Sequence, residues 1–268
     1  MFTIATHGAP GRPNEDYVVA TPELAVVVDG AGIPFGGCSH GVAWYARQLA
    51  THTAAAVLAA ADTPLRDGLA AGITAVAALH AGTCDLTSAS TPCAAVGILR
   101  LRDDVVDTLA LSDVTVVVET AEGIPHITCD LAIEELAGTE PDTLRNLEIG
   151  SPDHAAALRS LVERQTKTRN RDDGWWVAAA DPAAAHHAVI NTYPRAAVRR
   201  AAVLSDGATR PVDQMDLYKW PDYLDLLDEL GPVALIEHVR QIEREDPDGV
   251  VHARTKIHDD ATVAVLAP

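Results

Sequence analysis

Short apolar runs bounded by turn residues predict most of the strands in this chain. The clearest run is Leu24–Gly30, Leu-Ala-Val-Val-Val-Asp-Gly, in which β-branched residues end abruptly in an aspartate and a glycine. Such a run is typical of a fully buried strand that carries a carboxylate at its end. Similar runs predict strands at 2–6, 17–20, 93–101, 105–111, 114–119, 124–129, 175–179, 188–192, 198–205 and 261–266.

Apolar residues at three- and four-residue intervals predict the helices. We expect helices at 42–57, at 64–82, after the candidate N-cap Ser151, and at 223–230 and 232–242. The strands predicted between 93 and 129 are joined by short turns, which favours an antiparallel meander. Blocks of strands separated by groups of helices favour an α+β sandwich over a doubly wound sheet.

Composition and charge narrow the picture. The chain has 268 residues, 48% of them hydrophobic, and no repeat or linker divides it, so we expect a single domain spanning 1–268. The formal net charge of −18 argues against nucleic acid and anionic membranes as partners, because both attract basic surfaces. With neither a secretory signal nor a bilayer-length apolar run, we expect no membrane partner and a cytoplasmic monomer.

The cysteines stand at positions 38, 84, 93 and 129. They form neither a Cys-x-x-Cys pair nor a local Cys/His cluster, so the sequence predicts no zinc module and no disulfide framework. We expect scattered, reduced and partly buried thiols.

Carboxylates gather at the predicted strand ends. Asp29 and Asp206 each end an apolar run and precede a glycine, Asp259 precedes the last run, and Glu15 and Asp16 precede the strand next to Asp29. An Asp-Gly pair is also a common hairpin turn, but here each pair is followed by a loop and helical periodicity instead of a second strand. Neighbouring strand ends lie about 5 Å apart, where several carboxylates repel one another unless a cation lies among them. Oxygen ligands of this kind suit Mg²⁺ or Mn²⁺.

Ordered motifs make this interpretation specific. They are Arg12-Pro13-Asn14-Glu15-Asp16, Val28-Asp29-Gly30-Ala31-Gly32, Ser90-Thr91-Pro92-Cys93-Ala94, Leu111-Ser112-Asp113, Ser205-Asp206-Gly207 and Asp259-Asp260-Ala261-Thr262. In this order the sequence resembles the metal-dependent protein phosphatases of the type 2C, or PPM, family in their bacterial form, over residues 12 to 265.

The resemblance implies a four-layer α-β-β-α sandwich with two central antiparallel sheets and a binuclear Mn²⁺ or Mg²⁺ site at one edge. By position, Asp29 bridges both metals, the Gly30 carbonyl binds one, and Asp206 and Asp259 bind the other. The resemblance also implies that Glu15 and Asp16 hold metal-bound waters and that Asp113 helps to form a weaker third metal site. It implies that Arg12 binds the substrate phosphate.

The sequence also departs from the family pattern. Arg12 lies one residue nearer the acidic pair than is usual, and Ala31 stands where some members have a histidine proposed as general acid. The loop from Ile33 to His40 lacks the usual compact Gly-Gly-His pattern. Arg210 replaces an acidic residue, and Ser112 replaces the glycine before Asp113.

The resemblance implies hydrolysis of phosphoserine and phosphothreonine in a phosphorylated protein by a metal-activated water, with Asp29, Asp206 and Asp259 as the catalytic ligands. Two other classes remain open. One is a non-catalytic, phosphatase-like binding module, favoured by Arg210 and the altered loop. The other is an N-terminal-nucleophile hydrolase, for which Thr3 is poorly placed.

Overall fold

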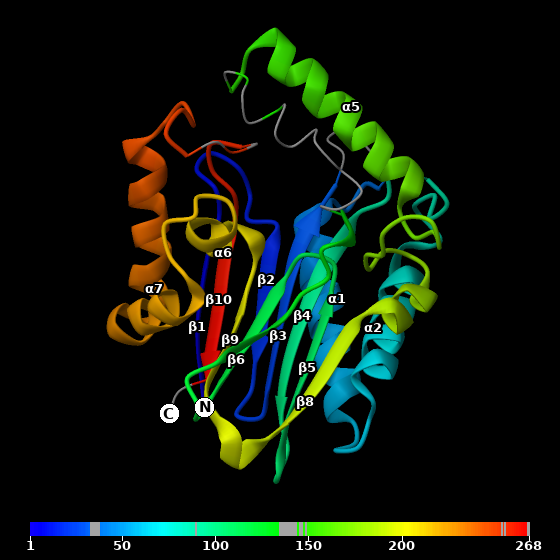
Figure 1. Cartoon of the computed structure of the whole chain (residues 1–268). Helices are drawn as coiled ribbons and strands as arrows, with labels where there is room; N and C mark the ends of the chain where they lie inside the picture. Colours follow the sequence, from blue (N-terminus) through cyan, green and yellow to red (C-terminus); the bar gives the residue numbers. More distant parts are fainter. Residues whose placement is uncertain are drawn as a thin grey trace.

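The computed structural model describes residues 1–32, 38–88, 90–133, 144, 147, 149–252, 254 and 256–266. Its strands form two five-stranded sheets in which every neighbouring pair is antiparallel. Sheet A has the order β1-β10-β9-β6-β7 and sheet B the order β2-β3-β4-β5-β8 (Figure 1). The bounds are β1 Phe2–His7, β2 Asp16–Ala20, β3 Leu24–Ala31, β4 Cys93–Leu101, β5 Val105–Leu111, β6 Thr115–Thr120, β7 Pro125–Thr128, β8 Val189–Pro194, β9 Val198–Leu204 and β10 Ala261–Leu266.

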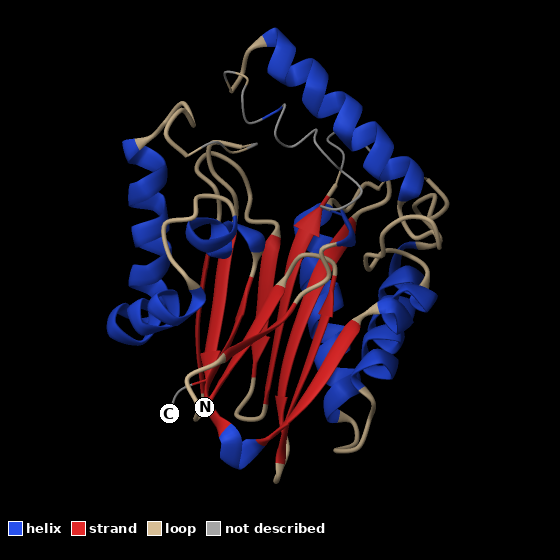
Figure 2. Cartoon of the chain, in the orientation of Figure 1, coloured by secondary structure: helices blue, strands red, loops and turns tan. Residues whose placement is uncertain are grey.

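Helices cover the outer faces of the two sheets (Figure 2). The helices α1 and α2 pack on sheet B, α6 and α7 pack on sheet A, and α5 lies across one end of the sandwich (Figure 1). The bounds are α1 Val42–Leu58, α2 Leu65–His80, α5 Pro152–Thr168, α6 Asp206–Asp213 and α7 Trp220–Glu245, with short 3-10 helices at Pro182–His187 and Arg195–Ala197. The α+β sandwich predicted from the sequence is therefore confirmed. No described helix is long and apolar enough to cross a bilayer.

Three apolar layers hold the sandwich together. One lies between α1, α2 and sheet B, one between the sheets, and one between sheet A and α6, α7. β3 contributes to two of them, and its residues Leu24 to Val28 are fully buried. Full burial of each valine stabilises the fold by roughly 1.5–3 kcal/mol, so β3 is a rigid support for the residues that follow it.

The expected meander between residues 93 and 129 is wrong in one respect. β4 and β5 pair in sheet B, but the chain then crosses to sheet A, where β6 pairs with β7 and β9. The crossing takes place at Ser112, whose φ of 64° turns the backbone sharply. Apolar content alone did not distinguish the sheets, because β5 and β6 are both buried on both faces.

One further expectation needs correction, and two are confirmed. The run 175–179 forms no strand but two isolated bridges, from Ala178 to Ala94 and from Trp175 to Arg169. The two helices predicted at 223–230 and 232–242 are confirmed as the two parts of α7, which are separated by Gly231 with its non-helical φ of 74°. Ser151 caps α5 as predicted, accepting a hydrogen bond from the His154 N–H at 3.1 Å. Positions 33–37 of the loop that departs from the family pattern lie outside the described residues.

Candidate active site

β3 carries Asp29 into the space between the sheets. Along this strand Val26 and Val28 pack beneath the helices, whereas Ala25 and Val27 face sheet A. Because side chains alternate along a strand, Asp29 continues the second series and points toward sheet A. The carboxylate of Asp29 therefore faces sheet A, so the predicted cluster draws on both sheets and not only on neighbouring strand ends of one sheet.

Asp16 lies directly opposite Asp29 in the β2–β3 ladder. Its Oδ2 accepts hydrogen bonds of 2.8 Å from the hydroxyls of Ser205 and Thr262, which belong to the sheet A side. Its Oδ1 is buried and has no partner among the described residues. Burial raises the pKa of Asp16 to about 7, the two hydroxyls oppose this shift, and Asp206 and Asp260 add to it. Asp16 thus has one buried oxygen without a partner among the described residues and lies near two other carboxylates, those of Asp206 and Asp260.

Asp206 is the first residue of α6, directly after β9 and Ser205. An interaction with the Asp29 carboxyl acts to lower the pKa of Asp206. Burial raises the pKa of both groups, and neighbouring carboxylates raise it further. Asp16 and Asp206 raise the pKa of Asp29. Asp259 raises the pKa of Asp206. The loop expected after Asp206 is absent, because α6 begins at this residue and its N-terminal dipole favours a carboxylate there.

Asp259, just before β10, is surrounded by cations. Its Oδ1 accepts a hydrogen bond from Arg12 at 2.8 Å, and its Oδ2 accepts from Lys256 at 2.7 Å and from Arg210 at 3.2 Å. Burial opposes ionisation of Asp259, but Lys256 and Arg210 outweigh it and lower its pKa. Asp259 is therefore a predicted metal ligand whose charge the protein already neutralises.

Lys256 was not singled out in the sequence, where no motif marks it. Enclosure of its ammonium group lowers its pKa, but Asp259, Asp206 and Asp29 raise it more strongly, and the net pKa lies above the usual value. About half of the side chain, 51%, is nevertheless exposed, which leaves a path for the ammonium group to move away. A lysine thus interacts with three carboxylates that the sequence assigns to metal.

Asp260 fixes the backbone beside the site. Its Oδ1 accepts a hydrogen bond from the Ala9 N–H at 2.6 Å, and its Oδ2 accepts from the Glu15 N–H at 2.8 Å. The Glu15 carbonyl in turn accepts from the Gly30 N–H at 3.2 Å. Arg12 is more exposed, with 39% of its side chain accessible, and its guanidinium lies 3.9 Å from Glu15. A buried aspartate therefore positions the loop that carries Arg12 and Glu15.

The glycines after Asp29 and Asp206 allow close backbone approach. A Cβ on Gly30 would lie 2.5 Å from the Glu15 carbonyl oxygen, and one on Gly207 would overlap the Asp260 carbonyl oxygen. Neither glycine has a positive φ. The two Asp-Gly pairs are thus not hairpin turns but points where a strand end meets a neighbouring segment.

Asp113 also lies near the cluster, since its charge contributes to the raised pKa of Asp29. It follows Ser112, whose hydroxyl donates to Asp113 Oδ1 at 3.2 Å. The left-handed φ of Ser112 explains why a glycine is expected at this position, because an L-residue there costs about 1–2 kcal/mol.

These residues form the acidic edge, which we define as Glu15, Asp16, Asp29, Asp113, Asp206 and Asp259. Within the described part of the chain, no three of them bring carboxylate oxygens within 4.8 Å of one another. This spread suits Mg²⁺ and Mn²⁺, which bind through one or two carboxylates each and keep several waters. The unpartnered Asp16 oxygen and the raised pKa values of Asp29 and Asp206 also fit a missing positive charge.

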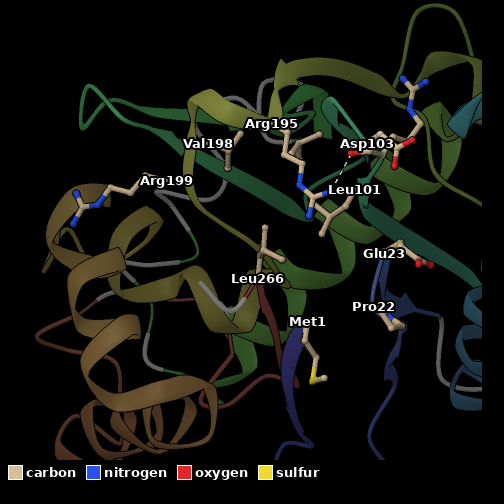
Figure 3. A pocket seen from close by; sticks show the side chains of 11 residues that line it. Met1, Pro22, Glu23, Leu101, Asp103, Arg195, Val198, Arg199 and Leu266 are labelled. Carbon is tan, nitrogen blue, oxygen red and sulfur yellow. Dashed lines mark hydrogen bonds between the residues drawn. The ribbon is translucent and has the colours of Figure 1, made fainter.

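A cavity of about 600 Å³ lies at the opposite strand ends (Figure 3). Met1, Glu23 and Leu266 line it, from the start of β1, the turn before β3 and the end of β10. The acidic edge lies instead at the end of β3 and the start of β10. This cavity is therefore separate from the candidate active site.

Comparison with solved structures identifies the architecture. Staphylococcus aureus serine/threonine phosphatase Stp1 matches with a TM-score of 0.60 and 13% identity, over 100% of this chain and 94% of Stp1. The PPM Ser-Thr phosphatase MsPP of Mycobacterium smegmatis, in complex with cacodylate, matches with a TM-score of 0.57 and 14% identity, over 99% and 97% of the two chains. The fold is that of the PPM-type phosphatases.

A third PPM-fold match is the catalytic domain of the serine/threonine phosphatase PstP in complex with two manganese ions. It has a TM-score of 0.52 and 15% identity, and the match covers 99% of this chain and 96% of that domain. No family model and no curated protein matches the sequence. The PPM resemblance seen in the ordered motifs is thus confirmed at the level of the fold, including the four layers and the two antiparallel sheets.

Proposed function

We propose that residues 1–268 form a single metal-dependent phosphatase domain of the PPM family that acts on phosphoserine and phosphothreonine in proteins. The observation that carries this proposal is the meeting of Asp16, Asp29 and Asp206 between two sheets without enough positive charge to balance them. Uncompensated buried carboxylates are costly for a fold, so an external cation is the simplest reason for their presence.

In this proposal Asp29, Asp206, Asp259 and the Gly30 carbonyl hold two Mn²⁺ or Mg²⁺ ions, and Asp113 serves a weaker third site. When bound, the ions activate a water at neutral pH and neutralise the phosphoryl oxygens. The unpartnered Oδ1 of Asp16 is available to accept a hydrogen bond from a water in the site. Glu15 is held beside it by the hydrogen bond from its N–H to Asp260.

Arg12 supplies the phosphate-binding group in this scheme. Its guanidinium is anchored by Asp259 at 2.8 Å and remains partly exposed, so it has both a fixed position and access to a substrate. A guanidinium presents several donors in one plane and is well suited to phosphoryl oxygens. A protein substrate carrying a phosphorylated serine or threonine would approach from this exposed side.

The positive charges around Asp259 favour a second candidate, a binding module without turnover. Lys256 and Arg210 already satisfy this carboxylate, and the half-exposed Lys256 would attract an anionic phosphopeptide. In that case the domain would bind a phosphopeptide without Mn²⁺ and release no phosphate.

The deciding experiment measures phosphate release from phosphoserine and phosphothreonine peptides with and without Mn²⁺ or Mg²⁺. We expect metal-dependent turnover, and Asp29→Asn should lower kcat/KM by at least about 1,000-fold, because the bridging ligand is lost. Asp67→Asn, the same change on the exposed surface of α2, is the matched control and should retain activity.

Calorimetry with the same peptides separates the two candidates. Metal-independent peptide binding with no phosphate release would replace the phosphatase proposal with the binding module. Absence of both turnover and binding, in protein that circular dichroism shows to be folded, would reject both.

A further inference from the structure

Four side chains that lie far apart in the sequence converge beside α1 and α2. The ligand atoms of Cys38, His40, His80 and Cys84 all lie within 4.8 Å of one another. Among the described residues this is the only group of three or more Cys, His, Asp or Glu side chains with that property. The expectation of scattered thiols and no Cys/His cluster is therefore wrong for Cys38 and Cys84.

The helical hairpin explains why separate parts of the sequence meet. α1 and α2 pack against each other and run in opposite directions, so the end of α2 returns to the segment that precedes α1. Cys38 and His40 come from that segment, and His80 and Cys84 from the end of α2. The spacings, Cys-x-His and His-x-x-x-Cys, are each short enough to provide two ligands from one chain segment.

The distances match those of a tetrahedron around a metal ion. The Cys38 and Cys84 sulfurs are 3.5 Å apart, Cys38 Sγ lies 3.6 Å from His80 Nδ1, and Cys84 Sγ lies 3.4 Å from His40 Nδ1. Cys38 Sγ lies 3.7 Å from His40 Nδ1. With Zn–S near 2.3 Å and Zn–N near 2.0–2.1 Å, a tetrahedral site has S–S edges of about 3.8 Å and S–N edges of about 3.6 Å. The observed edges therefore leave room for one zinc ion.

Neither a disulfide bond nor hydrogen bonding alone accounts for the cluster as well as a metal ion does. The sulfur separation of 3.5 Å is far beyond a disulfide bond of about 2.05 Å, and none of the four cysteines forms a disulfide bond. Thiol–imidazole hydrogen bonds are weak, and His80 is fully buried with its Nε2 unpartnered among the described residues. A metal bond to Nδ1 would offset part of the cost of burying that ring.

The thiols also differ in their ease of ionisation. Burial raises the pKa of the Cys38 thiol. Burial also acts to raise the pKa of Cys84, but hydrogen bonding with Thr83, the Ser39 backbone, Cys38 and His40 outweighs it and lowers the pKa to about 5. A thiolate is the form of cysteine that binds metal.

We propose that Cys38, His40, His80 and Cys84 bind one structural Zn²⁺ ion, separate from the acidic edge. Two thiolates and two imidazoles in tetrahedral geometry select zinc over Mg²⁺ or Mn²⁺, which prefer oxygen ligands. Four protein ligands leave no open position, so the ion has a structural role. It fastens Cys38 and His40, just before α1, to the end of α2.

The first test measures the zinc content of the full chain by mass spectrometry after gel filtration in metal-free buffer. We expect about one equivalent per chain in the wild type and a more than about 100-fold loss of zinc affinity in Cys84→Ser and in His40→Ala. Cys129→Ser is the matched control and should retain the zinc. Retention of equal zinc by Cys84→Ser and Cys129→Ser would overturn the proposal, as would a zinc-free wild type that takes up no added zinc.

The second test needs no variant and therefore does not depend on the folding of one. Cobalt replaces zinc in the wild-type chain, and the visible spectrum is recorded. Intense ligand-field bands with a sulfur-to-cobalt charge-transfer band indicate the tetrahedral thiolate site, and a weak octahedral spectrum would overturn the proposal. Both readouts are independent of phosphate release, so this proposal and the proposed phosphatase activity can fail separately.

Discussion

Asp16 at the acidic edge and Asp246 at the end of α7 are both buried, yet their surroundings shift their acidity in opposite directions. Burial raises the pKa of Asp16 to about 7, and the nearby Asp206 adds to the shift. Burial also disfavours the ionised form of Asp246, but the backbone N–H groups of His252, Val251 and Val250 and the Arg254 side chain lower its pKa to about 2. Asp246 has enough hydrogen-bond donors to stabilise its ionised form, whereas Oδ1 of Asp16 has no donor among the described residues.

The same contrast extends to their neighbours. Next to Asp246 lies an arginine network, defined here as Arg210, Arg240, Glu243, Asp246 and Arg254. In it the fully buried Glu243 accepts from Arg210 at 2.7 Å and from Arg240 at 2.8 Å. Asp259 touches both regions, because Arg210 also donates to it. Glu243 and Asp246 have cationic partners within the fold. For Asp16, Asp29 and Asp206, the proposed function supplies the positive charge as metal ions.

The largest expected effect comes from removing a cation from the arginine network. Arg210→Met should lower the free energy of unfolding by about 3–5 kcal/mol, because it leaves Glu243 and Asp259 with less compensation in a buried site. Urea denaturation measures the change. Arg47→Met, at an exposed position of α1, is the control and should change stability by less than about 0.5 kcal/mol. An equally small loss in Arg210→Met would show that the network is not structural.

The second effect is a stability maximum at acidic pH in protein freed of Mn²⁺ and Mg²⁺. Asp16 binds a proton in the folded chain between its ordinary pKa of 3.8 and about 7, so stability should fall by on the order of 1–3 kcal/mol as pH rises through that range. Asp246 has the depressed pKa, so its contribution is lost as pH falls from about 4 to about 2.

Urea denaturation across this pH series measures both limbs. Asp16→Asn should flatten only the limb above the maximum, and Asp246→Asn only the limb below it. A profile in which Asp16→Asn leaves the upper limb unchanged would contradict the contrast between the two regions.

The smallest effect concerns Lys256, which competes with metal for the same carboxylates. Lys256→Ala should tighten Mn²⁺ binding by about 3–10-fold, a modest gain because the lysine side chain is half exposed and its charge is screened. Isothermal titration calorimetry measures the affinity. Lys219→Ala, which removes an exposed lysine paired with Asp216, is the control. Weaker Mn²⁺ binding in Lys256→Ala would mean that the lysine supports the site instead of competing with it.

Much of the fold could be predicted because local pattern and tertiary structure agree. The β-branched run Leu24–Val28 is a buried strand, and Ser151 caps α5. The apolar residues at three- and four-residue intervals in α1 and α2 face sheet B. The carboxylates of the acidic edge were also predicted, since each one follows or precedes an apolar strand. The way these carboxylates come together was not predicted, because strand spacing within one sheet gives no information about side chains that meet between two sheets.

The missed features depend on contacts between distant segments. The change of sheet at Ser112 depends on the pairing of β6 with β9. The sequence contained no sign of it, because β5 and β6 are both buried along almost their whole length. Cys38 and Cys84 come together only because α2 returns along α1. The paired spacings Cys-x-His and His-x-x-x-Cys were the available signal, and a search for two half-sites instead of one local cluster would have found it.

The pairing of the first and last strands has a consequence for chain topology. β1 and β10 are antiparallel neighbours, with Phe2 opposite Leu266, and both ends of the chain lie at the end of the sandwich away from the acidic edge (Figure 1). The first and last strands therefore end close to each other in space. A circular permutant could join these ends with a short linker and place the new termini in the β6–β7 turn, at the exposed Gly123. It would keep every strand pairing, and only the turn that links β6 to β7 would be cut.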